Sequence, residues 1–478
     1  MDLIIPGVDI RVIRELVPRP LGATGVLGIV GCVEKDLSNK PLQALASFAS
    51  FKDTFGPASA LAMPEVKQAF AAGLNQVVVA NVPADAATAA SISVPLTVDG
   101  KPARLNVQAR APGAWGNQVS IRLTKKPGPA GDEVVEVEVF FPDAETLIEK
   151  KAVETFRNLS PMRDAGDRHF INVVNSRSEI VRVELRAVAD PNSQVLPTND
   201  LPGATPLLLK GGTDPSSDAI ATALARLESF GEVDLVTAAH LYPEADAMKV
   251  WAEVLTHANK MSNQAKPRLA FGQVAPSATG AAPDTTQAVR MAGRLVSDRF
   301  VMTAPNGYMG AMIGMIAGLR YFESPTFKPL VGVTDLAFDF SDPALAALIQ
   351  GGLCAVDEIP RKGIACVKGI TTDTTQINVT RIADRAVRHV QNIAQDFVGL
   401  LNTEAQRLAL KQRITEAFTR MEKEGALVPS TDGKSPAFAV AVESAPDDFA
   451  AGIVRVATAV RPVRAIDYIY ATIKVQAF

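Results

Sequence analysis

Two uninterrupted apolar runs constrain this fold more than any other feature: VLGIVGCV at residues 26–33 and QVVVANV at residues 76–82. A strand that is apolar on both sides must be covered on both faces, which is typical of parallel sheets flanked by helices. Between the runs, PEVKQAFAAG at 64–73 has Pro in its first turn and Gly at its end, as helices do. The sequence therefore predicts a strand–helix–strand block of an α/β domain.

The same alternation returns after residue 205. Strands are expected at 234–239, 268–274 and 299–305, and helices at 244–263 and 308–321. The apolar run at 309–319 is too short to span a bilayer and predicts a buried helix. Two long helices follow, at 382–400 and 403–425.

Residues 93–200 have a different hydrophobic pattern: short runs in which apolar and polar residues alternate are separated by loops rich in Gly, Pro, Asp and Asn. This composition predicts an all-β domain inserted into the α/β chain. Trp115 lies at its beginning, between Pro112-Gly113 and Gly116-Asn117. We interpret Trp115 as a structural corner that buries apolar area, in preference to a ligand contact.

Alternating segments also lie near both ends of the sequence. A strand of this kind must find a sheet edge, because an unpaired edge promotes aggregation. It pairs within its own domain or completes the sheet of a neighbouring molecule, and the sequence leaves both possibilities open. The alternating apolar residues are Val8, Ile10, Val12, Ile469, Ala471, Ile473 and Val475.

The predicted fold class is a multidomain α/β (α+β) protein: an α/β core, an inserted all-β domain and terminal β-strand arms. The expected divisions are an N-terminal arm at 1–24, a core at 25–92 and 205–345, an insertion at 93–204, a C-terminal α/β domain at 346–451 and a C-terminal strand arm at 452–478.

Composition argues against several functions. Of the 478 residues, 47% are hydrophobic and 21% charged, and the net charge of −3 gives no basic excess for a nucleic acid or a membrane surface. The four histidines are scattered, and the glycines at 22, 25, 28 and 31 have the wrong spacing for a dinucleotide-binding loop. LysGlyGlyThrAsp at 210–214 is better explained by capping of a helix, by Asp214 or Ser216, than by anion binding. We expect no catalytic, cofactor-binding or metal-binding residues; a nucleotide-binding α/β enzyme is the lesser alternative.

Two further groups of residues have alternative interpretations. Cys32, Cys354 and Cys366 match no zinc or CxxC spacing, so they are buried thiols or, outside a reducing compartment, disulfide partners. Basic residues on the two long helices form a solvated face or a docking face for an acidic protein. Those of interest are Arg381, Arg385, Arg388, Arg407 and Lys411.

In their order and spacing, several phrases resemble those of contractile tail sheath proteins, which occur in bacteriophages and related injection systems. The phrases are PGVDI at 6–10, TGVLGIVG at 24–31, PGAWGNQVSI at 112–121, LKGGTD at 209–214, INVTRIADRAV at 377–387 and EGAL at 424–427. The block at 340–372 is also similar, although Lys368 stands where the family usually has Trp. The segment APNGYMGAMIG at 304–314 also differs from the family's usual motif.

The resemblance implies a mechanical role. Sheath subunits stack as rings, here expected to be hexameric, around an inner tail tube protein, and they meet baseplate and tail terminator proteins. The extended sheath contracts and drives the tube through a target envelope for genome ejection, while terminal arms exchange strands between subunits. The candidate tube-facing element is one of the two long helices, 382–400 or 403–425, and the five basic residues above lie on these helices or at their entry. The expected location is the virion tail, assembled in the bacterial cytoplasm; an injection system or phage-like bacteriocin is the alternative.

Overall fold

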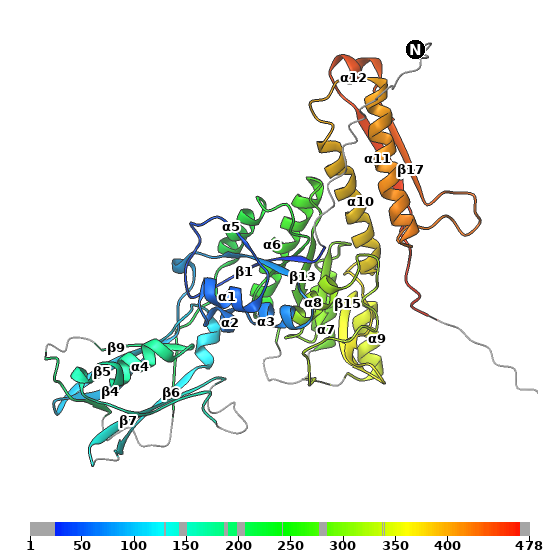
Figure 1. Cartoon of the computed structure of the whole chain (residues 1–478). Coiled ribbons are helices and arrows are strands. Elements are labelled where there is room, and N and C mark those ends of the chain that lie inside the picture. Colours follow the sequence, from blue (N-terminus) through cyan, green and yellow to red (C-terminus); the bar gives the residue numbers. More distant parts are fainter. Residues whose placement is uncertain are drawn as a thin grey trace, which may run out of the picture. The chain divides into compact units, whose positions relative to one another are not determined.

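The computed structural model describes residues 24–128, 131–142, 151–185, 190–197, 206–240, 242–276, 284–336, 338 and 340–468. The chain divides into two compact units (Figure 1). We call residues 24–380 together with 465–468 the α/β unit, and residues 381–464 the helix–hairpin unit.

The α/β unit is built on one sheet with the strand order β16-β15-β14-β13-β12-β1-β3-β2. Its six central strands are parallel, and the edge strands β2 and β16 run antiparallel to their neighbours. The bounds are β1 Val26–Gly31, β2 Ala44–Leu45, β3 Gln76–Asn81, β12 Leu235–Ala238, β13 Leu269–Gln273, β14 Phe300–Ala304, β15 Leu353–Ile359 and β16 Gly363–Cys366. The predicted α/β fold class is confirmed. Because β15 and β16 extend this sheet, residues 353–366 share the core of the α/β unit.

Helices cover both faces of the sheet. Helices α5 (Ser217–Leu227) and α6 (Glu244–Asn263) lie on one face, and α3 (Pro64–Ala71) and α8 (Met309–Gly318) on the other (Figure 1). Outside the insertion, this unit also contains the helices α1 Phe48–Phe55, α2 Ser59–Ala62, α7 Thr285–Gly293 and α9 Asp342–Gln350. Residues 309–317 of α8 are all buried, as its sequence predicts. Within the described ranges, every helix is too short or too polar to cross a bilayer.

Helices α3 and α8 approach closely because α8 presents glycines to α3. A Cβ on Gly310 would lie 2.6 Å from the backbone of Glu65, and one on Gly314 would overlap the carbonyl oxygen of Ala69. Two glycines one turn apart thus let the backbones touch where any side chain would separate them.

The insertion consists of two antiparallel sheets and one helix. One sheet has the order β10-β4-β5-β9 and the other β11-β6-β7-β8. The helix, α4 (Phe170–Arg177), buries Phe170 and Val174 and was not expected from the β-like texture. The strands are β4 Ser91–Val98, β5 Lys101–Ala109, β6 Ser120–Pro127, β7 Glu133–Phe140, β8 Glu154–Leu159, β9 Val181–Leu185, β10 Val195–Pro197 and β11 Leu207–Leu208. Because β11 pairs with β6, residues 207–208 belong to the insertion's sheet although they follow the expected division at 204/205.

Trp115 is the structural corner that the sequence predicts. Its side chain is 2% exposed, its Nε1 donates a hydrogen bond to the carbonyl of Pro112 at 3.0 Å, and its ring meets Phe141 edge to face. Gly113 has a φ of 124°, and a Cβ there would lie 2.9 Å from the indole. The glycine therefore gives the turn its conformation and leaves room for the ring.

The helix–hairpin unit contains most of α10 (Ile377–Gln395), then α11 (Glu404–Lys423), β17 (Phe438–Glu443), α12 (Pro446–Ala450) and β18 (Arg455–Val460). Strands β17 and β18 form a two-stranded antiparallel sheet. The buried face of α11 packs on it through Phe418, whose ring lies 5.6 Å from that of Phe438. Residues 455–460 are thus half of a hairpin within the described chain, although they fall in the expected C-terminal arm.

The contact between α3 and α8 generates a stability prediction. Replacing Gly314→Ala should lower the free energy of unfolding by about 1–3 kcal/mol, because an inserted methyl group forces two packed helices apart. The matched control is Gly293→Ala, at the last residue of α7, where a Cβ meets nothing within 4 Å. Urea titration of both variants should show Gly293→Ala unchanged or more stable; equal stability of the two variants would contradict the packing argument.

Burial of His257 generates a pH prediction. Desolvation, followed by the charge of Arg268, lowers the pKa of His257 to about 4. The unfolded chain, with a histidine pKa near 6.5, binds this proton at a higher pH than the folded chain does. The free energy of unfolding therefore falls by up to about 3 kcal/mol as the pH falls from roughly 6.5 to 4. Unfolding measured across this range should show a shallower loss for His257→Gln than for the native chain. Parallel pH profiles would refute this assignment.

Candidate assembly site

The β17–β18 hairpin is the clearest candidate for contacts with other molecules. Each of its strands has one partner, and among the described residues no third strand joins this sheet. One face of the hairpin is covered by α11, whereas β18 is mostly exposed. Both outer edges therefore carry backbone groups that an additional strand can pair with.

Helix α11 offers a second surface on the same unit. Its buried face consists of Leu410, Ile414, Phe418 and Met421. The opposite face borders a shallow hollow of about 400 Å³. We call this the open face of α11; its residues are Leu408, Lys411, Gln412, Thr415, Glu416 and Thr419.

The five basic residues predicted for a tube-facing helix lie in different environments. On α10, Arg381 is only 5% exposed, and Arg385 and Arg388 are partly buried. Arg407, at the start of α11, donates hydrogen bonds to the side chain and backbone of Asn402. Lys411 is exposed on the open face of α11. Of these five residues, Lys411 is the one that is exposed.

The predicted strand residues of the two arms lie outside the described ranges. They are Val8, Ile10, Val12, Ile469, Ala471, Ile473 and Val475.

The three cysteines are buried free thiols in this structure. The Sγ atoms of Cys354 and Cys366, on the adjacent strands β15 and β16, lie 3.3 Å apart. Contact with Cys354 and burial raise the pKa of Cys366 well above its usual value, and burial raises that of Cys32 to about 12. The raised pKa values keep the thiols of Cys32 and Cys366 protonated at neutral pH. Disulfide formation stays a prediction for oxidising conditions.

The residues considered for chemistry have structural partners. Ser216, and not Asp214, caps α5, by accepting a hydrogen bond from the backbone of Ala219. Burial lowers the pKa of His389 to about 4, with help from Arg385 and Arg420, and it also lowers that of His169. In the described part of the chain, no group of three or more His, Cys, Asp or Glu side chains is arranged to hold a metal ion.

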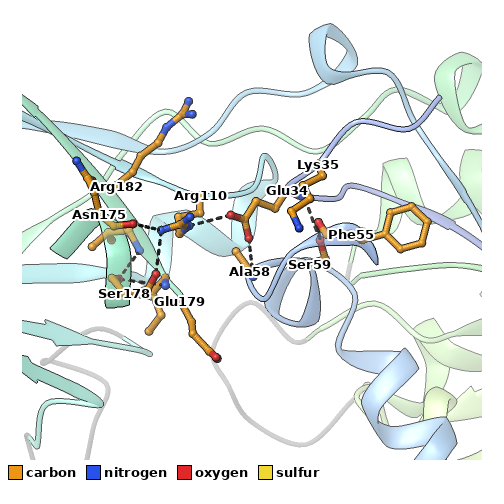
Figure 2. A network of polar contacts seen from close by, with 12 residues as sticks. Glu34, Lys35, Phe55, Ala58, Ser59, Arg110, Asn175, Ser178, Glu179 and Arg182 are labelled. Carbon is orange, nitrogen blue, oxygen red and sulfur yellow. Dashed lines mark hydrogen bonds and ion pairs between the residues drawn. The ribbon is translucent and has the colours of Figure 1, made fainter. Parts of the chain in front are cut away.

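The junction between the insertion and the core is a polar network that sequence reasoning missed (Figure 2). Glu34 follows β1; its Oε1 accepts a hydrogen bond from Arg110 Nε at 2.8 Å, and its Oε2 accepts one from the backbone of Ala58 at 3.1 Å. Arg110 follows β5 in the insertion, and its guanidinium also donates to the carbonyls of Asn175 and Ser178, at the end of α4. One ion pair thus satisfies unpaired backbone groups on both sides of the junction.

A second contact holds the two linkers of the insertion together. The carbonyl of Thr88 accepts hydrogen bonds from the backbones of Gly113 and Thr213, and Asp214 accepts one from the backbone of Ala114 at 2.8 Å. Asn117 exchanges two hydrogen bonds with the backbone of Gly212. The insertion is therefore fixed to the core at several points, and not only through its covalent connections.

The junction yields a prediction with an internal control. Replacing Arg110→Ala should destabilise the protein by about 2 kcal/mol, because Glu34 and two carbonyls lose a charged partner in a mostly buried setting. Lys52→Ala, which breaks the neighbouring exposed pair with Glu179, should cost less than about 0.5 kcal/mol. Urea unfolding of both variants measures the difference. A cost for Lys52→Ala equal to that of Arg110→Ala would argue against a specific role for Glu34–Arg110.

Comparisons with known proteins agree with this architecture. No known protein-family profile matches the chain. It is 29% identical over 180 residues to the tail sheath protein of Bacillus phage SP01, a match that covers 32% of this chain and 30% of that relative. The matched region thus spans about a third of either protein.

Two solved structures share the fold over nearly the whole chain. The helical sheath of the anti-feeding prophage in its contracted state has a TM-score of 0.54 at 13% identity, with 98% of each chain covered. A sheath tail protein from Listeria innocua has a TM-score of 0.50 at 12% identity, with 93% of this chain and 96% of that chain covered. The resemblance found in the sequence is confirmed: this chain has the fold of the contractile tail sheath proteins.

Proposed function

We propose that this chain is a structural subunit of a contractile tail sheath. Copies polymerise as helical rings around an inner tube, and contraction drives the tube through a target cell envelope. The fold supports the sheath of a phage tail and the sheath of a contractile injection system or phage-like bacteriocin equally well. Placement in a virion tail and a role in genome ejection belong to the phage alternative.

The observation that carries this proposal is the open β17–β18 hairpin. It is a partly exposed two-stranded sheet whose outer edges pair with no further strand of the described chain. The sequence also contains alternating segments around residues 8–12 and 469–475. A two-stranded sheet is only marginally stable by itself, so added strands would bury its edges. Strands supplied by neighbouring copies would link subunits without fixing the angle between their main bodies.

The inner tube is the partner proposed for the open face of α11. Lys411 provides an exposed cation there, and Leu408 is 54% exposed beside it. The three arginines on α10, Arg381, Arg385 and Arg388, are buried or partly buried, which favours α11 over α10 as the tube-facing helix. Baseplate and tail terminator proteins would cap the ends of the polymer.

The proposed role is mechanical and not enzymatic. Free energy would be stored in the packing between subunits and released when the interfaces repack, since packed interfaces have discrete arrangements. The insertion would move with the α/β unit because Glu34–Arg110 and the paired linkers couple them.

Removal of residues 469–478 tests the role of the C-terminal segment. We expect the truncated subunit to keep the melting temperature of the native chain, because all elements described above remain, and to lose polymerisation because one linking strand is missing. Differential scanning fluorimetry measures the first effect, and electron microscopy with sedimentation measures the second.

The control is Ile473→Val, which keeps the alternation and should still give helical tubes. Tubes of normal length from the truncated chain would refute strand exchange through this segment. Compact particles from the native chain, together with a nucleotide-dependent rise in melting temperature, would favour the enzyme alternative.

A further inference from the structure

The segment Ala465–Tyr468 follows the helix–hairpin unit in the sequence and belongs to the α/β unit, where it contacts Lys368 and Gln376. Its main contact is the side-chain amide of Gln376. The backbone N–H of Ala465 donates to Gln376 Oε1 at 2.9 Å, and Gln376 Nε2 donates to the carbonyl of Ala465 at 3.1 Å. Gln376 thus binds both backbone groups of one residue, as a neighbouring strand would do.

Lys368 provides the second contact. Its Nζ lies 3.0 Å from the hydroxyl of Tyr468, 5.0 Å from the centre of that ring and 3.7 Å from Oδ2 of Asp467. The same Asp467 oxygen accepts a hydrogen bond from Gln376 Nε2 at 2.8 Å. The Lys368 and Asp467 side chains are only 21% and 14% exposed, so their attraction is less screened than that of a surface pair.

The backbones at both contact residues are held by other parts of the α/β unit. Lys368 directly follows a residue whose backbone pairs with Ala355 of β15, and its own carbonyl accepts a hydrogen bond from Cys354 Sγ. Gln376 immediately precedes α10 and forms a β-bridge with Ile370. These contacts fix the backbone at both positions, and so they limit where the two side chains can reach.

The Lys368 ammonium makes two contacts at once, with the hydroxyl of Tyr468 and with the carboxylate of Asp467. Both partners lie nearly a hundred positions further along the sequence, so the tertiary structure brings them to Lys368.

We propose that Lys368 and Gln376 form a clamp that fixes the base of the C-terminal strand segment to the α/β unit. The clamp sets the point from which residues 469–478 reach a second copy of this chain, and in this respect it rests on the proposed function. Ala465 and Asp467 face the clamp, whereas Ile466 between them is 80% exposed. Exposure therefore alternates along residues 465–467, as it does along an extended strand.

Hydrogen exchange on the unassembled full-length chain tests the clamp by itself. Gln376→Ala should speed exchange of the Ala465 amide roughly three- to tenfold, the range expected for loss of one net hydrogen bond. Lys368→Ala should increase exchange in the peptide that contains residues 465–468, and Lys368→Arg should restore protection because it keeps the cation. The matched control is Lys362→Ala, a cation 5.5 Å from the ring of Phe327, which should leave this peptide unchanged.

Assembly of the same variants tests what the clamp is for. Lys368→Ala and Gln376→Ala should raise the concentration needed for polymerisation, with unchanged melting temperatures and with Lys368→Arg close to native. Unchanged exchange at 465–468 in both alanine variants would overturn the clamp, whatever assembly shows. Increased exchange with native assembly would overturn its role in presenting the segment. If the native chain itself forms no polymer, the proposed function fails and so does that role, while the exchange data still decide the anchoring contacts.

Discussion

The α/β unit depends on strand β1, because β1 pairs with β3 on one side and with β12 on the other. The two neighbours are more than 150 positions apart in the sequence, and the whole insertion lies between them. Asp234, just before β12, reinforces this arrangement by accepting hydrogen bonds from the backbones of Gly25 and Val26. The parallel pairing of β1 with both neighbours therefore requires the chain to re-enter the core close to the point where it left, whatever the conformation of the insertion.

The paired linkers and the Glu34–Arg110 ion pair meet this requirement. The backbone hydrogen bonds of Thr88 join the two linkers of the insertion to each other, and the ion pair joins the insertion to the segment after β1. An insertion on a loose tether would transmit no force, whereas one fixed by several partly buried contacts moves with the core. This distinction matters for a subunit whose proposed work is mechanical, since load must pass between the parts of each subunit.

The helix–hairpin unit contrasts with this arrangement. Among the described residues, no further strand pairs with the edges of its two-stranded sheet, and α11 has an open face. Several apolar side chains of its loops are exposed, such as Val398 and Leu401 at about 80%. A monomer rarely maintains such surfaces without a use for them. Contacts with other copies and with a tube would account for them, and the clamp at Lys368 and Gln376 would anchor one of the connecting segments to the α/β unit.

Much of the α/β unit could be predicted from sequence because its signals are local. Continuous apolar runs located β1, β3, β13 and β14, and an apolar run bounded by polar residues located α8. The alternation around residues 93–200 indicated the insertion. Strand β17 was missed although FAVAVE also alternates, since its small alanines give a weak apolar signal. Helix α4 was missed because only one turn of its periodic pattern stands out from a β-like region.

By itself, the sequence determined most central strands and the long helices, the place where the residue pattern changes, and the family motifs that are present, because these properties depend on neighbours along the chain. Only the tertiary structure decided that β15 and β16 extend the core sheet, that β11 belongs to the insertion, and that Lys368 meets Asp467 and Tyr468. The same holds for Glu34 and Arg110, which are 76 positions apart and 2.8 Å apart in space. Partner choice over such separations depends on how whole layers pack, and no local pattern of residues encodes it.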